Sequence, residues 1–473
     1  MVNEYTFPAG VYVTPKGKST NSGSPSSPLD LATALTKAKS PVKPGQTVWV
    51  RSGLYQGHFI STLEGTADLP IIVRAYPGER ASVAGSISAD SGGAVWFWGL
   101  EVYNPSTQRK SMQTGSAPTD IPIHDGIGCV VPSCKFINMA VHDALGNGFG
   151  LWMKPANVEV YGCLSYYNGW QAPDRAHGHG YYGQSADPRH ISQNFIFLNY
   201  ENGLQLYGSD NARIDHYLIE QNSFWSAGML VLNGGVNVSI AAGGAPATDN
   251  TFFSNLVYHP MKQAYSLAIG KSSGGPLPMG LLDVRANYLA GKIQVANWQS
   301  IRFTNNTVLS NVQLVNLIEN AIANPTIVWD SNVYTADADT YSFKYSGTVM
   351  DNKQWQAKGF DRNSTFTVAS AWAGVRVFIQ ANAYEPGRGH ITVFNWDHKS
   401  NVTVDLTGVV EVGQSFDVRN ANDFFGPSVL TGVYNGPVTL PLTGLTMAQP
   451  VGQPAPPAPT APEFAAYVVL PRV

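Results

Sequence analysis

Charged residues and long apolar runs are both scarce in this 473-residue chain, and each scarcity excludes a class of function. Only 13% of the residues are charged, and 29 basic residues against 32 acidic ones give a net charge of −3. Without a basic excess the chain has no field to hold a nucleic-acid backbone or an anionic membrane. No run of about 18 apolar residues occurs, so no segment is expected to span a bilayer. We therefore expect a neutral partner, and neither nucleic acid nor a membrane.

Cysteine is scarce too, with only Cys129, Cys134 and Cys163. Three cysteines cannot all pair in disulfides, and no Cys-x-x-Cys motif predicts a zinc site, so we expect buried thiols and neither a metal nor another cofactor. No loop motif supports a calcium ion. The start, MVNEYTFPAG, lacks the charged and apolar regions of a secretory signal. Either the protein stays inside the cell, or a signal was removed before this numbering begins; we expect the second, and a secreted or periplasmic protein.

Glycine and proline are abundant, at 47 and 31 residues, and 11% of the chain is aromatic. This composition is typical of a turn-rich folded chain and excludes both disorder and a coiled coil. The length exceeds that of one ordinary compact core, so it predicts either two domains or one elongated array of repeats.

A repeat runs through the middle of the chain. Each copy is a small or amide residue followed by alternating apolar residues, as in NFIFLNY or NTVLS. From Asn138 onward the copies begin 19 to 33 residues apart, which suits rungs of two or three short strands and is too irregular for a β-propeller. In stacked rungs the recurrent asparagines can hydrogen-bond along the stack. The copies begin at Asn138, Gly162, Asn194, Asn222, Asn255, Asn287, Asn306 and Asn332, with an earlier one at Gly99.

These features predict an all-β protein. We expect a right-handed parallel β-helix over residues 1–370 and a β-sandwich domain over 371–473, where short alternating strands and turn signals follow. The segment LDLATALTKAKSPVKPG (29–45) has helical spacing and ends at Pro-Gly, so we expect it to form a helical cap on the first rung. A capped solenoid is expected to be a monomer.

Three segments near the start carry a family resemblance. They are PGQTVWVRSGLYQGHF, GTADLPIIVRAYPGERASVAG and VWFWGLEVYN, and DNKQWQAKGFDRNSTF (351–366) resembles an element near the end of such helices. Together they resemble carbohydrate-active right-handed parallel β-helix proteins of the pectate lyase-like superfamily. These include chondroitinase B and alginate lyase types and β-helix glycoside hydrolases. The resemblance implies a polysaccharide or oligosaccharide substrate, but it does not choose a reaction.

Six of the ten histidines lie between residues 124 and 216, which is about a fifth of the chain. We therefore place the chemistry in this window. It also contains the pairs His124-Asp125 and His142-Asp143, and many other side chains that can bind sugars or carry protons.

An aromatic row is predicted on the outside of three rungs. The strands 148–154, 178–184 and 203–209 were aligned on their first glycines, with Phe149 and its equivalents pointing inward. The alternate positions then place Trp152, Tyr182 and Tyr207 on one exposed face, beside Lys154 and Gln184. Aromatic faces stack on sugar rings, so an extended glycan could lie there; the alternative is that the aromatics stack only for stability.

The insertion NGWQAPDRAHGHG (168–180) lies on the same side and carries Trp170, Asp174, Arg175, His177 and His179. Long loops with acids, bases and an aromatic are more often functional than not. The alignment places His179 inward, either as a satisfied core histidine or in a bulge. Two histidines at i and i+2 also suggest a metal, but no third ligand is specified.

Two reactions compete. A glycoside hydrolase needs two carboxyl groups, for which Asp174 and Asp187 are the first choices, with Asp143 and Glu201 in neighbouring turns. A polysaccharide lyase needs a base and a cation for a uronate carboxylate, roles open to Lys154, Arg175, Arg189, His177 and Tyr182. The few basic residues favour hydrolysis slightly. A third possibility is a non-catalytic glycan-binding β-helix. We expect the enzyme, with Asp174 and Asp187 as acid and base or nucleophile. In this enzymatic hypothesis Lys154 and Arg175 orient substrate, and His177 and His179 are alternates for proton transfer. The side chains expected to bind the sugar are Trp152, Trp170, Tyr182, Tyr207, Gln184 and Arg189.

Overall fold

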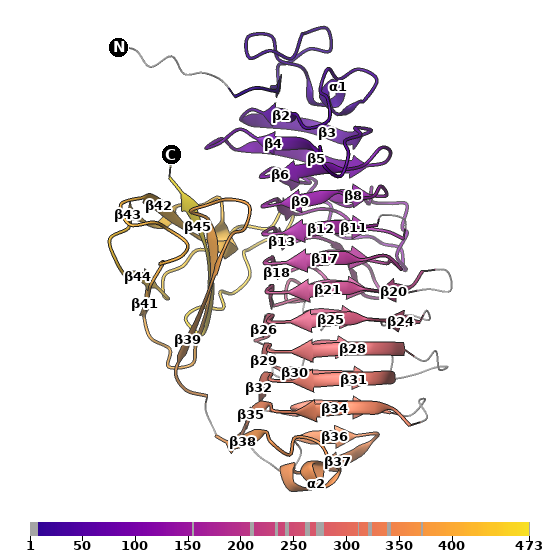
Figure 1. Ribbon diagram of the computed structural model, residues 1–473, viewed down its shortest axis with the longest axis vertical. Helices are drawn as coiled ribbons and strands as arrows, with labels where there is room; N and C mark the ends of the chain where they lie inside the picture. The colour runs from indigo at the N-terminus through magenta and orange to yellow at the C-terminus, as the bar shows by residue number, and fades with distance from the viewer. Residues whose placement is uncertain are drawn as a thin grey trace.

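The computed structural model describes residues 8–153, 156–208, 212–231, 235–241, 246–260, 265–270, 279–310, 312–319, 324–337, 342–369 and 372–472. Parallel strands stack in rungs along one axis, and further sheets lie beside the stack (Figure 1). The all-β, right-handed parallel β-helix predicted from the repeat is confirmed.

The first face of the β-helix is a sheet of 12 parallel strands. One row of its side chains points inward and is almost entirely buried: Val48, Val73, Phe97, Phe136, Val160, Ile191, Ile219, Phe252, Val284, Phe303 and Trp329. Each such side chain contributes about 1.5–3 kcal/mol by leaving water, so a period-2 apolar pattern is enough to hold one register. The strands are β1 (Val11–Val13), β2 (Thr47–Val50), β4 (Ile71–Ala75), β6 (Val95–Trp98), β9 (Lys135–Ile137), β12 (Val158–Tyr161), β17 (Arg189–Ser192), β21 (Tyr217–Glu220), β25 (Asn250–Phe253), β28 (Met279–Arg285), β31 (Trp298–Thr304) and β34 (Thr326–Asp330).

The second face follows the first in every rung, and the long strands β3 (Gly53–Ser61) and β5 (Ala81–Ala89) begin it. β5 pairs with β7 at one end and with β8, of the third face, at the other. The second face continues as β7 (Glu101–Tyr103), β10 (Ala140–His142), β13 (Leu164–Tyr166), β18 (Phe195–Phe197), β22 (Ser223–Trp225), β26 (Leu256–Tyr258), β29 (Tyr288–Ala290), β32 (Thr307–Ser310), β35 (Val333–Ala336) and β38 (Thr365–Val368).

The third face closes each rung and carries the candidate site. Its strands are β8 (Ile127–Cys129), β11 (Phe149–Leu151), β16 (Tyr181–Gly183), β19 (Leu204–Leu206), β23 (Val238–Ile240), β27 (Tyr265–Ile269), β30 (Lys292–Ala296), β33 (Val315–Ile318) and β36 (Phe343–Tyr345), with β37 (Thr348–Met350) antiparallel to β36. Two pairs lie outside the faces: the hairpin β14 (Trp170–Gln171) with β15 (Ala176–His177), and β20 (Ile214–Asp215) with β24 (Ala247–Thr248).

The predicted asparagine ladder is present at the corner between the first and second faces. The Nδ2 of Asn194 donates to Oδ1 of Asn222 at 2.9 Å, and the same bond links each later pair as far as Asn332. Each Oδ1 also accepts the backbone N–H of the asparagine one rung before it. The ladder therefore satisfies backbone donors that the corner leaves without a strand partner.

Short helices close both ends of the stack (Figure 1). At the N-terminal end α1 covers only Leu31–Leu35, so the helix expected over 29–45 is wrong beyond residue 35. It ends there because Thr62 replaces the partners that a further turn would supply. The Thr62 backbone N–H donates to the Leu35 carbonyl, and the Lys37 backbone N–H donates to the Thr62 hydroxyl. At the other end α2 (Asn352–Ala357) begins at an Asp351 capping box and buries Trp355.

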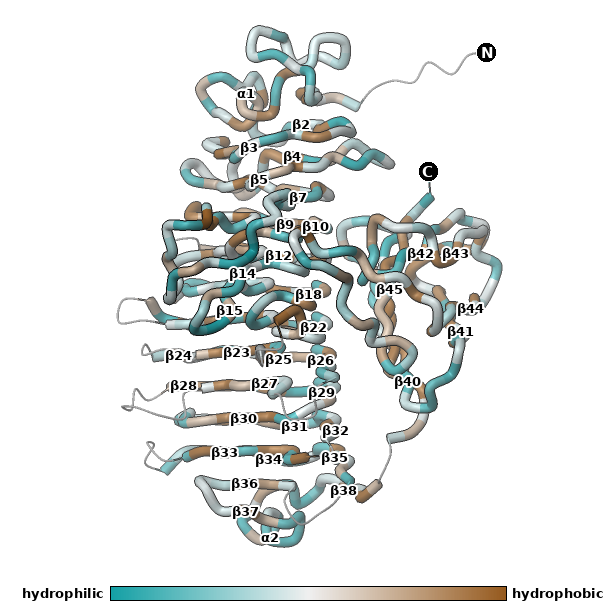
Figure 2. Tube along the Cα trace, turned by 180° about the vertical axis from the view of Figure 1, so that it is seen from behind, coloured by the Kyte–Doolittle hydropathy of each residue, from teal (hydrophilic) through white to brown (hydrophobic). Residues whose placement is uncertain are grey.

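The C-terminal strands form a five-stranded antiparallel sheet and a two-stranded one around a common apolar cluster. They pack against the second face of the β-helix in both views (Figure 1; Figure 2). The predicted boundary at residue 370 lies outside the described residues, and the division into two domains with a sandwich stays a prediction. The strands are β39 (Val375–Ala381), β40 (Gly389–Asn395), β45 (Phe464–Pro471), β42 (Ser415–Asn420) and β43 (Ser428–Val433), then β41 (Asn401–Val404) with β44 (Val438–Pro441), and the 3-10 helix η1 spans Ala421–Asp423.

Candidate functional site

The register of the third face differs from the predicted alignment by two residues. Tyr181, not His179, pairs with Phe149 and Leu204 and fills the inward row. The equivalent glycines are therefore Gly148, Gly180 and Gly203, whereas the alignment used Gly178, the first of two glycines in His-Gly-His-Gly. A shift of two residues keeps each side chain on its face. Tyr182 thus stays outside, but His179 lies in the turn before β16 rather than in the core row.

Two of the predicted aromatics form a contact pair on this face. The ring centroids of Trp152 and Tyr182 are 5.0 Å apart, and the Trp152 side chain is 43% exposed. Gln184 Nε2 donates to the Tyr182 hydroxyl at 3.2 Å. Burial raises the pKa of Tyr182, with smaller contributions from Tyr207 and two carboxylates described below. Tyr207 is also exposed, at 41%.

Two residues predicted to bind sugar are buried instead. Trp170 is 1% exposed and stacks on the His177 ring at 4.2 Å. Arg189 is also 1% exposed, and its guanidinium donates to the carbonyls of Leu151, Trp152 and Gln184 at 2.5 to 2.9 Å. Neither side chain reaches the surface, so in this structure neither is placed to contact a glycan.

The predicted acids do not share contacts. Asp174, between β14 and β15, accepts the Gly115 backbone N–H at 3.2 Å. Burial alone would raise the pKa of Asp174, but this bond, the backbone N–H of Asp174 itself and the charges of His177 and Arg175 together lower it. Asp187 is exposed, and its backbone N–H bonds the Ser185 hydroxyl in its own turn. Lys154 lies outside the described residues.

The two histidines of the insertion are held neutral in different surroundings. Burial lowers the pKa of His177 to about 4, and its Nε2 lies 4.0 Å from Asp174 Oδ1. Burial lowers the pKa of His179 to about 3. Asn202 N–H donates to Nδ1 of His179 at 3.2 Å, so the neutral ring carries its proton on Nε2, which is 3.6 Å from Glu201.

Glu201 and Arg175 form the centre of the cluster. Arg175 Nη1 donates to both carboxylate oxygens of Glu201, at 3.0 and 3.1 Å. Burial nevertheless raises the pKa of Glu201, and Arg175 only partly offsets it. The Glu201 side chain is 24% exposed, so solvent or a substrate can still reach it.

A second carboxyl group with a raised pKa precedes β8, three rungs before the β19 rung that Glu201 precedes. Asp125 is half-buried, and a Cβ built on Gly150, which pairs with Tyr182, would collide with its Oδ2. Asn147 donates to Oδ1 through its backbone N–H at 2.8 Å and its Nδ2 at 2.9 Å, but burial outweighs these bonds and raises the pKa. Asn147 Oδ1 also accepts the His179 backbone N–H. Asn147 and His179 therefore connect Asp125 to Glu201.

Comparison with known proteins gives a family match to the helical part of the chain. Residues 11–244, just under half of the 473, match the family described as "Pel9A-like, right handed beta helix region". This part of the chain is therefore similar to the helix region of that family. No curated protein sequence matches it.

The chain also resembles several solved structures at low identity. Pectate lyase Pel9A is 14% identical with a TM-score of 0.42, covering 77% of this chain and 82% of that one. The GH136 lacto-N-biosidase from Eubacterium ramulus is 14% identical with a TM-score of 0.45, covering 76% and 68%. A mannuronic acid specific family 6 lyase from human gut microbiota is 13% identical with a TM-score of 0.45, covering 71% and 88%.

The sequence could not show that Asp125 and Glu201 both lie near enough to Tyr182 for their charges to act on it. Both lie in the histidine-rich window, but only the register of β11, β16 and β19 brings them to the same aromatic pair. Among the described residues, no group of three His, Cys, Asp or Glu side chains is placed to hold a metal ion, so the His-Gly-His pair has no third ligand there. No helix in the described part of the chain is long and apolar enough to cross a membrane.

Proposed function

We propose that the protein is a secreted or periplasmic enzyme that degrades an extended glycan by hydrolysing its glycosidic bonds. The observation that carries this proposal is the pair of carboxyl groups with raised pKa values, Asp125 and Glu201, near the exposed Trp152 and the half-buried Tyr182. Glycoside hydrolysis needs one carboxylic acid that holds its proton and one carboxylate. The Pel9A-like fold supports a carbohydrate substrate.

The surroundings distinguish the two roles. Asp125 receives hydrogen bonds from Asn147 and has no cationic partner among the described residues, so it suits the general acid that protonates the leaving oxygen. Glu201 is bound by Arg175, which favours the ionised form and suits the base or nucleophile. Trp152, Tyr182 and Tyr207 offer ring faces for the sugar.

The test uses purified protein with a panel of neutral and acidic polysaccharides. Reducing ends and the ultraviolet absorbance of an unsaturated product are followed together. We expect new reducing ends without absorbance, and a loss of about 10²–10⁴-fold in rate for Asp125→Asn and for Glu201→Gln. Asp249→Asn, an exposed aspartate far along the chain, is the matched control and should keep the full rate.

Two further variants decide between this pair and the sequence-based one. If Asp174→Asn and Asp187→Asn abolish the reaction while Asp125→Asn does not, the assignment returns to the pair predicted from the sequence. Binding without any product on the whole panel would instead support the non-catalytic glycan-binding alternative.

One observation favours a lyase as the second candidate. Arg175 is 49% exposed beside the neutral His177, an arrangement that could neutralise a uronate carboxylate next to a base. Equal signals in both assays, together with loss of activity in Arg175→Gln, would establish β-elimination and overturn hydrolysis.

A further inference from the structure

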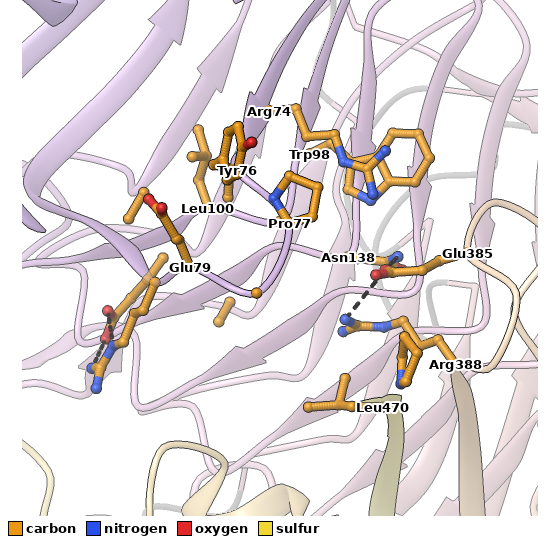
Figure 3. Close-up of a pocket in the computed structure, with 18 of the residues that line it drawn as sticks. Arg74, Tyr76, Pro77, Glu79, Trp98, Leu100, Asn138, Glu385, Arg388 and Leu470 are labelled. Atoms are coloured by element: carbon orange, nitrogen blue, oxygen red, sulfur yellow. Dashed lines mark hydrogen bonds and ion pairs between the residues drawn. The ribbon is translucent and has the colours of Figure 1, made fainter. Parts of the chain in front are cut away.

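A separate cavity of about 720 Å³ lies where the corner between the first and second faces meets the C-terminal sheets (Figure 3). The β-helix contributes the loop from Arg74 to Ala81 and residues 98–101, and the C-terminal part contributes Arg388 and its neighbours. The candidate site described above lies at the start of the third-face strands, so the two sites occupy different corners. A volume of this size suits one or two sugar rings.

Most charges in the cavity are already paired. Arg80 donates to both oxygens of Glu101 at 2.5 and 2.7 Å, and Arg419 lies 2.7 Å from Asp417. Glu79 is bound by Arg51. Five arginines line the cavity against four carboxylates, and these pairs account for three of the carboxylates.

Three lining arginines remain, Arg74, Arg388 and Arg472, and the charge of the fourth carboxylate, Glu385, acts on the first two. Arg388 is 7% exposed, its Nη1 is 3.6 Å from Glu385, and its Nε has no hydrogen-bond partner. Glu385 itself also accepts Asn138 Nδ2 at 2.8 Å. A buried guanidinium with an unmet donor costs free energy unless an acceptor reaches it.

Arg74 is the other arginine of this set. Its guanidinium lies 3.9 Å from the ring centroid of Trp98, and the described part of the chain shows no hydrogen bond or ion pair to it. Glu385 acts on its charge only at a distance. Figure 3 shows Arg74 and Trp98 on the same side of the cavity as Glu385 and Arg388. Two guanidinium groups with one shared carboxylate leave room for a second anion.

We propose that this cavity binds a sugar that carries a carboxylate, that is, a uronate unit. Its carboxylate accepts from the guanidinium groups of Arg74 and Arg388, a geometry in which arginine forms strong paired hydrogen bonds. Its ring lies against Pro77, Leu100 and Leu470, the apolar side chains of the lining. The proposal goes beyond the cleavage reaction and does not depend on it, because binding is measured without turnover.

The test is calorimetric titration of the full chain with methyl glucuronoside, and separately with methyl glucoside, sulfate and phosphate. We expect the uronate to bind at least about tenfold more tightly than the neutral glucoside, because a charge-assisted pair is lost with the carboxylate. Arg74→Gln should weaken uronate binding about tenfold and lower the melting temperature only slightly, since Arg74 contacts the Trp98 ring but has no ion pair with any described residue. Arg362→Gln, an exposed arginine at the far end of the stack, is the control and should bind as the unaltered protein does.

Arg388→Gln supplies a second readout, because the residue comes from the C-terminal side of the cavity. Uronate should raise the melting temperature of the unaltered protein and not that of Arg388→Gln, even if this variant is less stable. Equal affinity for glucoside and glucuronoside, or unchanged binding in Arg74→Gln, overturns the proposal. Binding of sulfate or phosphate alone, without the uronate, overturns it too and leaves a simple anion site.

Discussion

At the scale of single residues, Arg189 shows how this β-helix accommodates a charge in its interior. Its guanidinium lies near Tyr181 and Tyr217 and satisfies three backbone carbonyls at the end of β11 and in the turn after β16. These carbonyls belong to the strands that carry the aromatic pair. A buried cation of this kind stabilises the fold only while all its acceptors stay in place.

Replacing Arg189 with leucine should therefore lower the free energy of unfolding by about 3 kcal/mol or more, because three buried carbonyls lose their donor. Urea denaturation followed by tryptophan fluorescence measures this loss. Arg362→Leu, at an exposed position, should change stability by no more than about 0.5 kcal/mol. Equal stabilities for the two variants would mean that Arg189 has no structural role.

The sequence predicted where the candidate site lies better than it predicted which acidic residues there have raised pKa values. Asp174, Arg175, His177 and His179 do gather in one cluster, since they share an insertion of 13 residues. Asp125 and Glu201 were not selected, because they lie 76 positions apart in the chain and only stacking of rungs joins them. Burial is a property of the folded chain, so its effect on their pKa values could not be predicted.

At the scale of elements, the asparagine ladder could be predicted from the sequence, whereas the register of the third-face strands could not. The ladder was predictable because one residue type recurs at one corner of every rung. The register at β16 was not, because Gly178 and Gly180 both fit the pattern and only Tyr181 fills the core row between Phe149 and Leu204. The short helix α1 was overpredicted for a related reason: bonds to Thr62, distant in sequence, end it.

Asn255, in the middle of the ladder, is the natural place to test it. Asn255→Ala removes the bond to Asn287 and leaves the Asn222 backbone N–H without its acceptor, so we expect a loss of about 2–4 kcal/mol. Asn255→Asp keeps the acceptor and should lose less. The exposed Asn401→Ala is the control, and a urea midpoint for Asn255→Ala equal to that of this control would show that the ladder does not stabilise the stack.

At the scale of the whole molecule, the C-terminal sheets cover an aromatic column on the second face. Tyr103, His142 and Tyr166 stack in register, and Phe197 and Trp225 continue the column at centroid spacings of 4.9 and 4.2 Å. Trp225 Nε1 donates to Asn422 of the C-terminal part at 3.2 Å. This face is therefore closed to a glycan, and the exposed aromatics of the third face are the ones available to bind it.

His142, which lies between Tyr103 and Tyr166 in this column, is bonded to two carboxylates. His142 bonds Asp143 at 2.8 Å and Glu101 at 3.1 Å, and Asp143 in turn accepts the Val451 backbone N–H from the C-terminal part. Burial alone would lower the pKa of His142, but the two carboxylates outweigh it and raise the pKa above 6.5. Burial alone would raise the pKa of Glu101, but His142 and Arg80 lower it to about 2.

These two shifts predict a stability that falls on both sides of a plateau. The His142 contribution is complete below about pH 6.5 and is lost as the pH rises through its folded pKa. The Glu101 contribution is complete above about pH 4.5 and is lost as the pH falls toward about 2. The melting temperature should therefore be highest between about pH 4.5 and 6.5.

His142→Phe keeps the stacking but not the charge, so its melting temperature should not fall as the pH rises above 6.5. His216→Gln, at a half-exposed histidine beside Asp249, is the control and should show the same fall as the unaltered protein. If the melting temperature of His142→Phe still falls at alkaline pH, another group causes the fall. The contact between the β-helix and the C-terminal sheets would then not depend on the charge of His142.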